Sequence, residues 1–317
     1  MSWLDSYTHR ALLEAAMVGA LCGAIGLHVV LRRMSFFAMA MTHATFPGVV
    51  LAAVLGIDIY LGGAAMGLLV CLCVLALSRR RDPYTQGAAT ATGIVLATGF
   101  ALGVALLSAT SGFNRNLEAF MTGSIVTVTG QDLATTAGIG AAVLLALGAL
   151  HKELLYGAFD PEGQRAAGYP VAALDLLMLL LVEAVIVITA PAVGVMLAMA
   201  LIVGPAATAR LWSDRIRTTI LIAVGTGTGS CVLGLELSTR WDLAAGGTIT
   251  LVIAAAFLVS LLVSPHGAVR RVAVGVGRRA RGGGMGEGVE RFIHDGVGPD
   301  QGGSRPGGLR RVRFCRG

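Results

Sequence analysis

Residues 32–48 read RRMSFFAMAMTHATFPG and join one long apolar run to the next. Met39 and His43 are four residues apart, so on a helix their side chains share one face. An imidazole beside a thioether at the start of a membrane helix is a candidate site for a metal ion or a proton. The alternative is a histidine that hydrogen-bonds a neighbouring helix, with the methionines as packing residues.

The composition excludes a soluble globular domain. Hydrophobic residues make up 55% of the 317 residues, charged residues make up 13%, and the mean hydropathy is +0.77, whereas globular chains carry about 25% charged residues. The charges lie between apolar runs of about 20 residues, the length that crosses a bilayer. We predict an all-α polytopic membrane protein with nine transmembrane helices, or eight if the second run is re-entrant, over about 11–31, 36–56, 60–78, 88–108, 133–150, 172–190, 193–209, 219–237 and 248–263.

Two of these runs contain a proline. Pro47 and Gly48 stand in the middle of the second run, and Pro205 interrupts the seventh. Proline lacks a backbone N–H and leaves a helix carbonyl without its donor, which is tolerated where protein or a water-lined path receives that carbonyl. We therefore expect helix breaks at Pro47, Gly48 and Pro205.

The basic residues indicate an orientation. The loops that hold Arg32, Arg33, Arg79–Arg81, Lys152, Arg165, Arg210, Arg215 and Arg217 form one set, and the other set has Arg115 and Arg240, with Arg10 in the lead-in. Basic loops stay in the cytoplasm, so nine crossings put the N-terminus outside. The net charge of +6 is explained by these loops and the tail, and we expect no nucleic-acid binding.

The chain divides into three segments. Residues 1–10 are a polar lead-in, 11–266 form the transmembrane domain, and 267–317 are rich in Gly and Arg. That last composition cannot bury a core, so a disordered cytoplasmic tail is expected. The longest internal polar segment is 151–170, HKELLYGAFDPEGQRAAGYP. It is either a solvated loop or a short helix that docks on a partner.

Four stretches in order resemble the integral-membrane permeases of ABC-type zinc and manganese importers, the ABC-3 family. The stretches are Arg32–Ser35 with Thr42–Ala44 and Pro47–Gly48; Leu117–Phe120 with Gly123–Ser124 and Asp132–Leu133; Lys152–Leu154 with Phe159–Glu162, Arg165–Ala166 and Gly168; and Ala192–Gly194 with Pro205–Arg210. The resemblance as a whole covers about residues 8–266. The resemblance implies a type II ABC importer permease fold in the plasma (inner) membrane of a prokaryote, as a multi-pass protein.

The same resemblance implies a function and partners. The chain would form the translocation path as a homodimer, with a separate cytoplasmic ATPase and an extracytoplasmic metal-binding protein. It would transport zinc or manganese and bind no permanent cofactor. Because the sequence has no G-x-x-x-x-G-K-[ST] phosphate loop, ATP would be hydrolysed on the other polypeptide. The residues implied for ATPase coupling are Phe159, Asp160, Pro161, Glu162, Arg165 and Gly168.

The family's acid–histidine pair implies that His43 lines the path, but Met39 stands where the family has aspartate. A thioether favours softer ions than a carboxylate does. Glu183 lies midway along the sixth run and is either a substitute acidic ligand or a protonated acid bonded to another helix. An ion-coupled secondary transporter that uses Glu183 is the alternative function. No H-E-x-x-H motif supports an intramembrane metalloenzyme, so we do not expect an enzyme.

Overall fold

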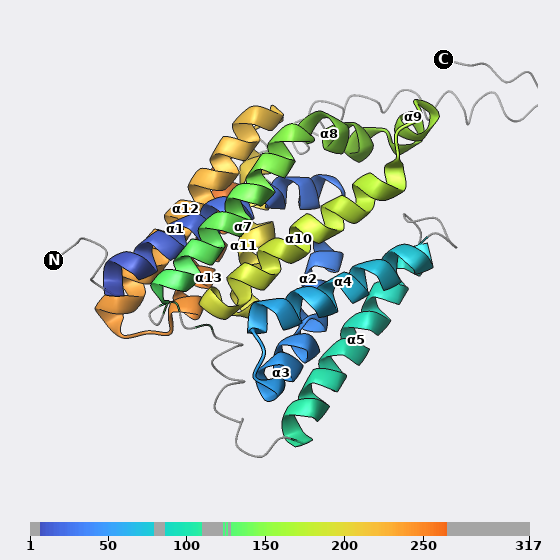
Figure 1. The fold of residues 1–317 in the computed structure, drawn as a ribbon. Coiled ribbons are helices and arrows are strands. Elements are labelled where there is room, and N and C mark those ends of the chain that lie inside the picture. Colours follow the sequence, from blue (N-terminus) through green and yellow to red (C-terminus); the bar gives the residue numbers. More distant parts are fainter. Residues whose placement is uncertain (1–6, 79–85, 110–122, 124, 126–127, 265–317) are drawn as a thin grey trace, which may run out of the picture. The chain divides into compact units, whose positions relative to one another are not determined.

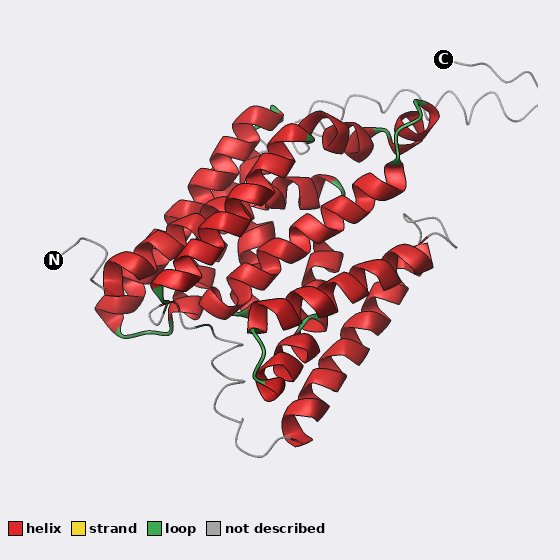
Figure 2. Cartoon of the chain, viewed as in Figure 1, coloured by secondary structure: helices red, strands yellow, loops and turns green. Residues whose placement is uncertain are grey.

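The computed structural model describes residues 7–78, 86–109, 123, 125 and 128–264, and in these residues the regular elements are helices (Figures 1 and 2). All of them belong to one compact unit, residues 1–268. The predicted tail and the loop arginines 79–81 lie outside the described residues. The helices are α1 (Tyr7–Leu31), α2 (Ser35–Ala44), α3 (Phe46–Leu55), α4 (Ile59–Ser78), α5 (Gln86–Ala109), α7 (Gly130–Ala149), α8 (His151–Phe159), α9 (Pro161–Ala166), α10 (Val171–Val193), α11 (Val195–Trp212), α12 (Ile216–Trp241) and α13 (Ala245–Val263).

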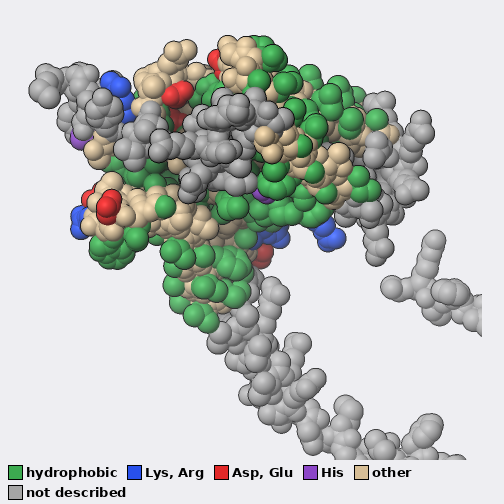
Figure 3. Space-filling view, turned by 90° about the horizontal axis from the view of Figure 1, so that it is seen from below, with side chains coloured by type: hydrophobic (Ala, Val, Ile, Leu, Met, Phe, Trp, Pro, Cys, Tyr) green, Lys and Arg blue, Asp and Glu red, His purple; other side chains and the backbone are tan. Residues whose placement is uncertain are grey.

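The helices match the predicted transmembrane runs. In the described part of the chain, 8 helical stretches are long and apolar enough to cross a membrane, with α2 and α3 counted as the single stretch Ser35–Leu55. The 24-residue α5, with its apolar part at Thr92–Leu106, corresponds to the remaining predicted run. Hydrophobic side chains cover much of the face in Figure 3, as a lipid-facing surface requires. The prediction of an all-α polytopic membrane protein is confirmed.

The two predicted proline breaks have different outcomes. The second run is divided at Thr45, and Pro47 lies in the first turn of α3, where its missing N–H costs little. Pro205, by contrast, lies inside α11, which continues to Trp212. The expected interruption at Pro205 is therefore wrong. Pro205 leaves the Leu201 carbonyl without its helical donor, and a membrane helix tolerates such a proline where neighbouring groups receive that carbonyl.

Helices α2 to α5 pack mainly on one another, and α1, α11, α12 and α13 form a second group. Helix α10 contacts both groups, through α2 and α4 on one side and through α1, α7 and α11 on the other. It therefore occupies the boundary between the two groups (Figure 1).

Hydrogen bonds bring alternate chain turns to the same end of the bundle. The α1–α2 turn, α8 and the first turn of α10 meet through Arg32. At the opposite end, Tyr60 of α4 donates to Asp132 of α7 at 2.9 Å. Arg32, and Lys152 and Arg165 on α8 and α9, thus lie at one end, as the orientation prediction requires.

Glycines set the contact of α1 with α11 and α12. A Cβ atom on Gly19 would lie 2.6 Å from the Gly227 carbonyl oxygen, and one on Gly23 would lie 2.6 Å from the Ala223 carbonyl oxygen. Close backbone approach of this kind is typical of small-residue faces in membrane helices.

Gly26→Ala is expected to destabilise the protein by about 1–3 kcal/mol, because the new methyl group overlaps the backbone carbonyl of Ile202, which cannot rotate away. Gly225→Ala is the matched control, since a Cβ there meets no described atom within 4 Å and alanine is favoured over glycine in a helix by about 1 kcal/mol. Thermal unfolding of the detergent-solubilised variants measures both. Equal midpoints for the two variants would contradict the assigned packing.

Candidate functional site

His43 lies in the last turn of α2 and faces α5. Its ring packs edge-on against Phe100, with ring centroids 5.6 Å apart and an interplanar angle of 84°. Helix α5 approaches closely here because a Cβ on Gly99 would lie 2.9 Å from the Cα of Ala44. Met39 lies one turn before His43 on the same face, and both side chains are half-buried. The structure therefore brings together the two residues that the sequence paired.

The backbone around His43 is unusual for a helix. Pro47 is four residues later and has no N–H to donate to the His43 carbonyl. The neighbouring hydroxyls bond other carbonyls: Thr42 donates to Met39 O at 2.7 Å and Thr45 donates to Met41 O at 3.0 Å. The His43 carbonyl therefore cannot accept the regular helical hydrogen bond from residue 47, and the imidazole of the same residue is of a type that binds metal cations.

Glu183 is buried at the contact of α10 with α4. Its side chain is 3% exposed and its carboxylate lies where a Cβ on Gly67 would be. The absence of a side chain at Gly67 therefore makes the space for the carboxylate. Both carboxylate oxygens are buried without a hydrogen-bond partner among the described residues. Cys71, one turn further along α4, is fully buried.

These side chains do not form a closed metal cage. The described residues contain no group of three or more His, Cys, Asp or Glu side chains that could hold a metal ion. His43 has its aromatic neighbour in α5, whereas Glu183 has its glycine neighbour in α4. Helices α2 and α10 do contact each other. The three side chains therefore lie on adjoining helices without forming one cluster among the described residues.

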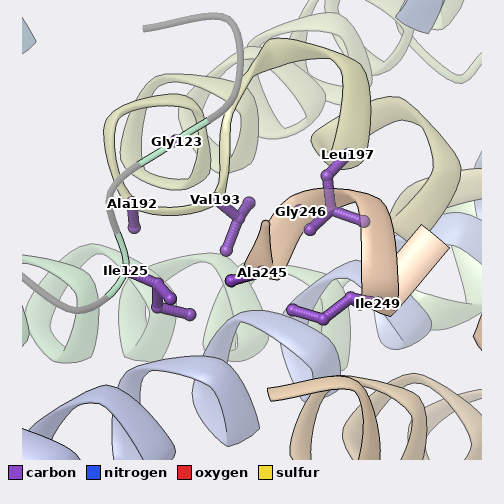
Figure 4. A pocket seen from close by; sticks show the side chains of 8 residues that line it. All are labelled: Gly123, Ile125, Ala192, Val193, Leu197, Ala245, Gly246 and Ile249. Carbon is purple, nitrogen blue, oxygen red and sulfur yellow. The ribbon is translucent and has the colours of Figure 1, made fainter. Parts of the chain in front are cut away.

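A small cavity lies elsewhere, between the ends of α10 and α13 (Figure 4). Its lining includes Val193, Leu197, Ala245 and Ile249, and the labelled residues are all apolar or glycine. Its described lining therefore contributes no polar side chain.

The segment 151–170 is a pair of short helices rather than an irregular loop. Asp160 caps α9, because its Oδ1 accepts a hydrogen bond from the Gly163 N–H at 2.8 Å, and Pro161 occupies the first turn, where proline is favoured. Gly168 has φ +84°, a left-handed conformation that favours glycine after a helix. Gln164 is 1% exposed and donates to the Glu153 carbonyl at 2.8 Å. The last bond fastens α9 to α8.

The six residues predicted for coupling therefore have two different roles. Asp160, Pro161 and Gly168 shape the element. Phe159, Glu162 and Arg165 are exposed on it, and the Phe159 side chain, at 66% exposure, is unusually open for an aromatic residue. An exposed aromatic residue beside charged residues is typical of a docking surface.

Sequence reasoning missed two polar connections between distant helices. Arg32 and Asp175 form an ion pair at 2.7 Å across 143 residues, and Glu14 accepts a hydrogen bond from the Thr136 hydroxyl at 2.7 Å. Spacing along the chain gives no sign of either. The one available signal was the presence of charged residues close to or inside apolar runs, which must find partners.

The fold and the site together define a polytopic helical membrane protein with a broken helix, a half-buried histidine beside the break and a rigid two-helix element at one end. The chain belongs to the ABC 3 transport family, which matches residues 5–264.

Three relatives illustrate the similarity. The chain is 33% identical to the manganese transport system membrane protein MntC of Halalkalibacterium halodurans over 82% of this chain and 88% of that protein. It is 34% identical to the manganese import system permease protein ScaB of Streptococcus gordonii, over 82% and 92% respectively. The solved structure of PsaBC from Streptococcus pneumoniae in complex with Fab matches with a TM-score of 0.75 and 32% identity, over 83% of this chain and 94% of that chain.

Proposed function

We propose that this chain is the permease subunit of an ABC-type importer of divalent metal ions in the bacterial plasma membrane. The observation that carries the proposal is the similarity to manganese permeases over four fifths of the chain. The structure supports it with a His43 that lies beside a helix break among helices long enough to cross the bilayer.

Manganese or zinc is the proposed substrate. His43 supplies an imidazole, Met39 a thioether and Glu183 a carboxylate on an adjoining helix. Imidazole suits zinc, and a carboxylate suits manganese as well. The two buried oxygens of Glu183 have no described partner, so this carboxylate is available to an ion that reaches the contact of α10 with α4.

The proposed partners follow from the two ends of the protein. A cytoplasmic ATPase contacts the α8–α9 element, which carries the exposed Phe159, Glu162 and Arg165. An extracytoplasmic metal-binding protein delivers the ion at the opposite end. A second copy of the chain completes the path as a homodimer.

Uptake of radioactive manganese or zinc into proteoliposomes tests the function. The permease is reconstituted with its ATPase partner facing the vesicle lumen and the binding protein outside. The vesicles should then accumulate metal only when ATP is present in the lumen, on the side of the ATPase. Accumulation without the ATPase would contradict the proposal and would indicate an ion-coupled transporter.

The ATPase contact has its own test. Glu162→Lys should reduce recovery of the ATPase with the permease by about 10-fold and reduce uptake in proportion, because a charge of the wrong sign at a docking surface is repulsive. Membrane insertion and thermal stability should not change, since Glu162 is exposed. Glu236→Lys is the matched control, because Glu236 is exposed in the last turns of α12 and its side chain forms an exposed ion pair with Arg240. Normal ATPase recovery with Glu162→Lys would show that the contact lies elsewhere.

A further inference from the structure

The turn between α1 and α2 is tightly bonded. The N–H groups of Arg32, Arg33 and Met34 donate to the carbonyls of His28, Val30 and Val29 at 3.0, 3.1 and 2.9 Å. Arg33 has φ 56°, which lets the chain reverse within these residues. The N–H of Ala38 donates to the Met34 carbonyl at 2.9 Å, so α2 follows the turn directly. A displacement of Arg32 therefore displaces the first turn of α2.

The Arg32 side chain joins this turn to two other elements. It is only 8% exposed, and its Nη1 donates to Oδ1 of Asp175 in α10 at 2.7 Å. Its Nη2 donates to the carbonyl of Leu154 in α8 at 3.2 Å. A guanidinium can bond both acceptors at once because its N–H groups form a planar fork. Lysine carries a single point charge and cannot reproduce this geometry.

The coupling element is packed directly on that guanidinium. A Cβ on Gly157 of α8 would lie 3.0 Å from Nη2 of Arg32, so the guanidinium approaches the backbone of α8 closely at this glycine. Gln164 binds α9 to α8 through the Glu153 carbonyl. Contacts therefore run without a gap from α9 through α8 to Arg32, and from Arg32 to α2 and α10.

We infer that Arg32 is a positioning residue that transmits displacement of α8–α9 to α2, the helix that carries Met39 and His43. Helix α10, which carries Glu183, is also joined to α9 directly along the chain. The inference rests on the proposed function, in which the ATPase contacts α8–α9. Packed elements joined by charged hydrogen bonds shift together rather than deform. Arg32 itself touches neither the ion nor the ATPase.

The first experiment compares transport with ATP hydrolysis. The permease is purified with its ATPase, reconstituted with the binding protein, and supplied with Mn²⁺. Arg32→Met should lower the metal ions transported per ATP hydrolysed by about 10-fold, because α8–α9 then moves without α2, while α10 stays joined to α9 through residues 167–170. Arg33→Met is the matched control, since Arg33 is the adjacent arginine and is exposed; it should retain the normal ratio. An unchanged ratio in Arg32→Met would overturn the inference.

The second experiment separates transmission from folding. Backbone hydrogen exchange is measured with and without a non-hydrolysable ATP analogue. In the unmodified complex, exchange should change in both 151–166 and 35–44; in Arg32→Met the change should persist in 151–166 and disappear from 35–44. A persisting response in 35–44 would overturn the role of Arg32. No response in 151–166 of the unmodified complex would instead overturn the ATPase contact.

A conservative variant of Asp175, alone and combined with Arg32→Met, shows whether the loss of transport comes from the missing ion pair or from misfolding. Asp175→Asn replaces the carboxylate with an amide of the same shape at a side chain that is 40% exposed. It should reduce the number of metal ions transported per ATP hydrolysed by a smaller factor than Arg32→Met does. Asp175→Asn added to Arg32→Met should cause no further loss, since the bond is already absent. Additive losses would show that the two residues act independently.

Discussion

His43→Ala is expected to abolish metal uptake, with a loss of about 100-fold or more, while the protein still inserts and folds. Removing only an outer partner of a metal ligand costs about 10–100-fold, and His43 is proposed as a direct ligand. The side chain is half-buried and its described ring contact is with Phe100. Losing one such contact should cost about 0.5–1.5 kcal/mol of stability. Uptake in proteoliposomes and thermal unfolding measure the two effects separately.

A second variant distinguishes a ligand from a packing residue. Phe100→Leu removes the same edge-to-face contact from the α5 side and leaves the imidazole in place. It should reproduce the small loss of stability and retain most of the uptake. If Phe100→Leu and His43→Ala lower uptake equally, the histidine holds α2 against α5 and the ion binds elsewhere.

Met39→Asp should raise uptake of manganese relative to zinc by about 10-fold, because a carboxylate prefers harder ions more than a thioether does. The new carboxylate would stand four residues before His43, on the same helical face. Met39→Leu is the control for size without sulfur or charge, and it should leave the manganese-to-zinc ratio below that of Met39→Asp. Competition between the two ions in the uptake assay provides the ratio. An unchanged ratio in Met39→Asp would remove residue 39 from the path.

The same variant tests Glu183. Glu183→Gln should reduce uptake more in the natural Met39 background than in Met39→Asp, since the two carboxylates can replace each other as the acidic ligand. Equal effects in both backgrounds would indicate a structural role for Glu183 at the α4–α10 contact. The isosteric amide keeps the volume that Gly67 accommodates, so the comparison reports the charge of residue 183 rather than its packing.

Arg32 and Glu162 act at different points of one sequence of contacts. Glu162 belongs to the surface that meets the ATPase, and Arg32 belongs to the connection between that element and the helices of the path. Variants of Glu162 should no longer bind the ATPase. Variants of Arg32 should still bind it and hydrolyse ATP, but should transport fewer metal ions per ATP hydrolysed. This difference allows the docking step and the transmission step to be assigned independently.

The amino-acid sequence by itself determined the positions of the membrane helices. Runs of about 20 apolar residues must form helices in a bilayer, where every backbone N–H and C=O has to be bonded within the segment. It also determined the shared face of Met39 and His43, because that follows from helix periodicity alone. The cap of α9 was local in the same sense, since Asp160, Pro161 and Gly168 act within a few residues of one another.

Only the tertiary structure decided which helices meet and what the buried polar groups do. The sequence did not show that Asp175 pairs with Arg32 or that Gly67 makes room for Glu183, because each pairing joins residues more than 100 positions apart. It also predicted a break at Pro205 that does not occur, since α11 continues through the proline to Trp212. A proline or a buried charge in a membrane helix leaves a polar group that needs a partner, and the packing of distant helices decides which group that partner is.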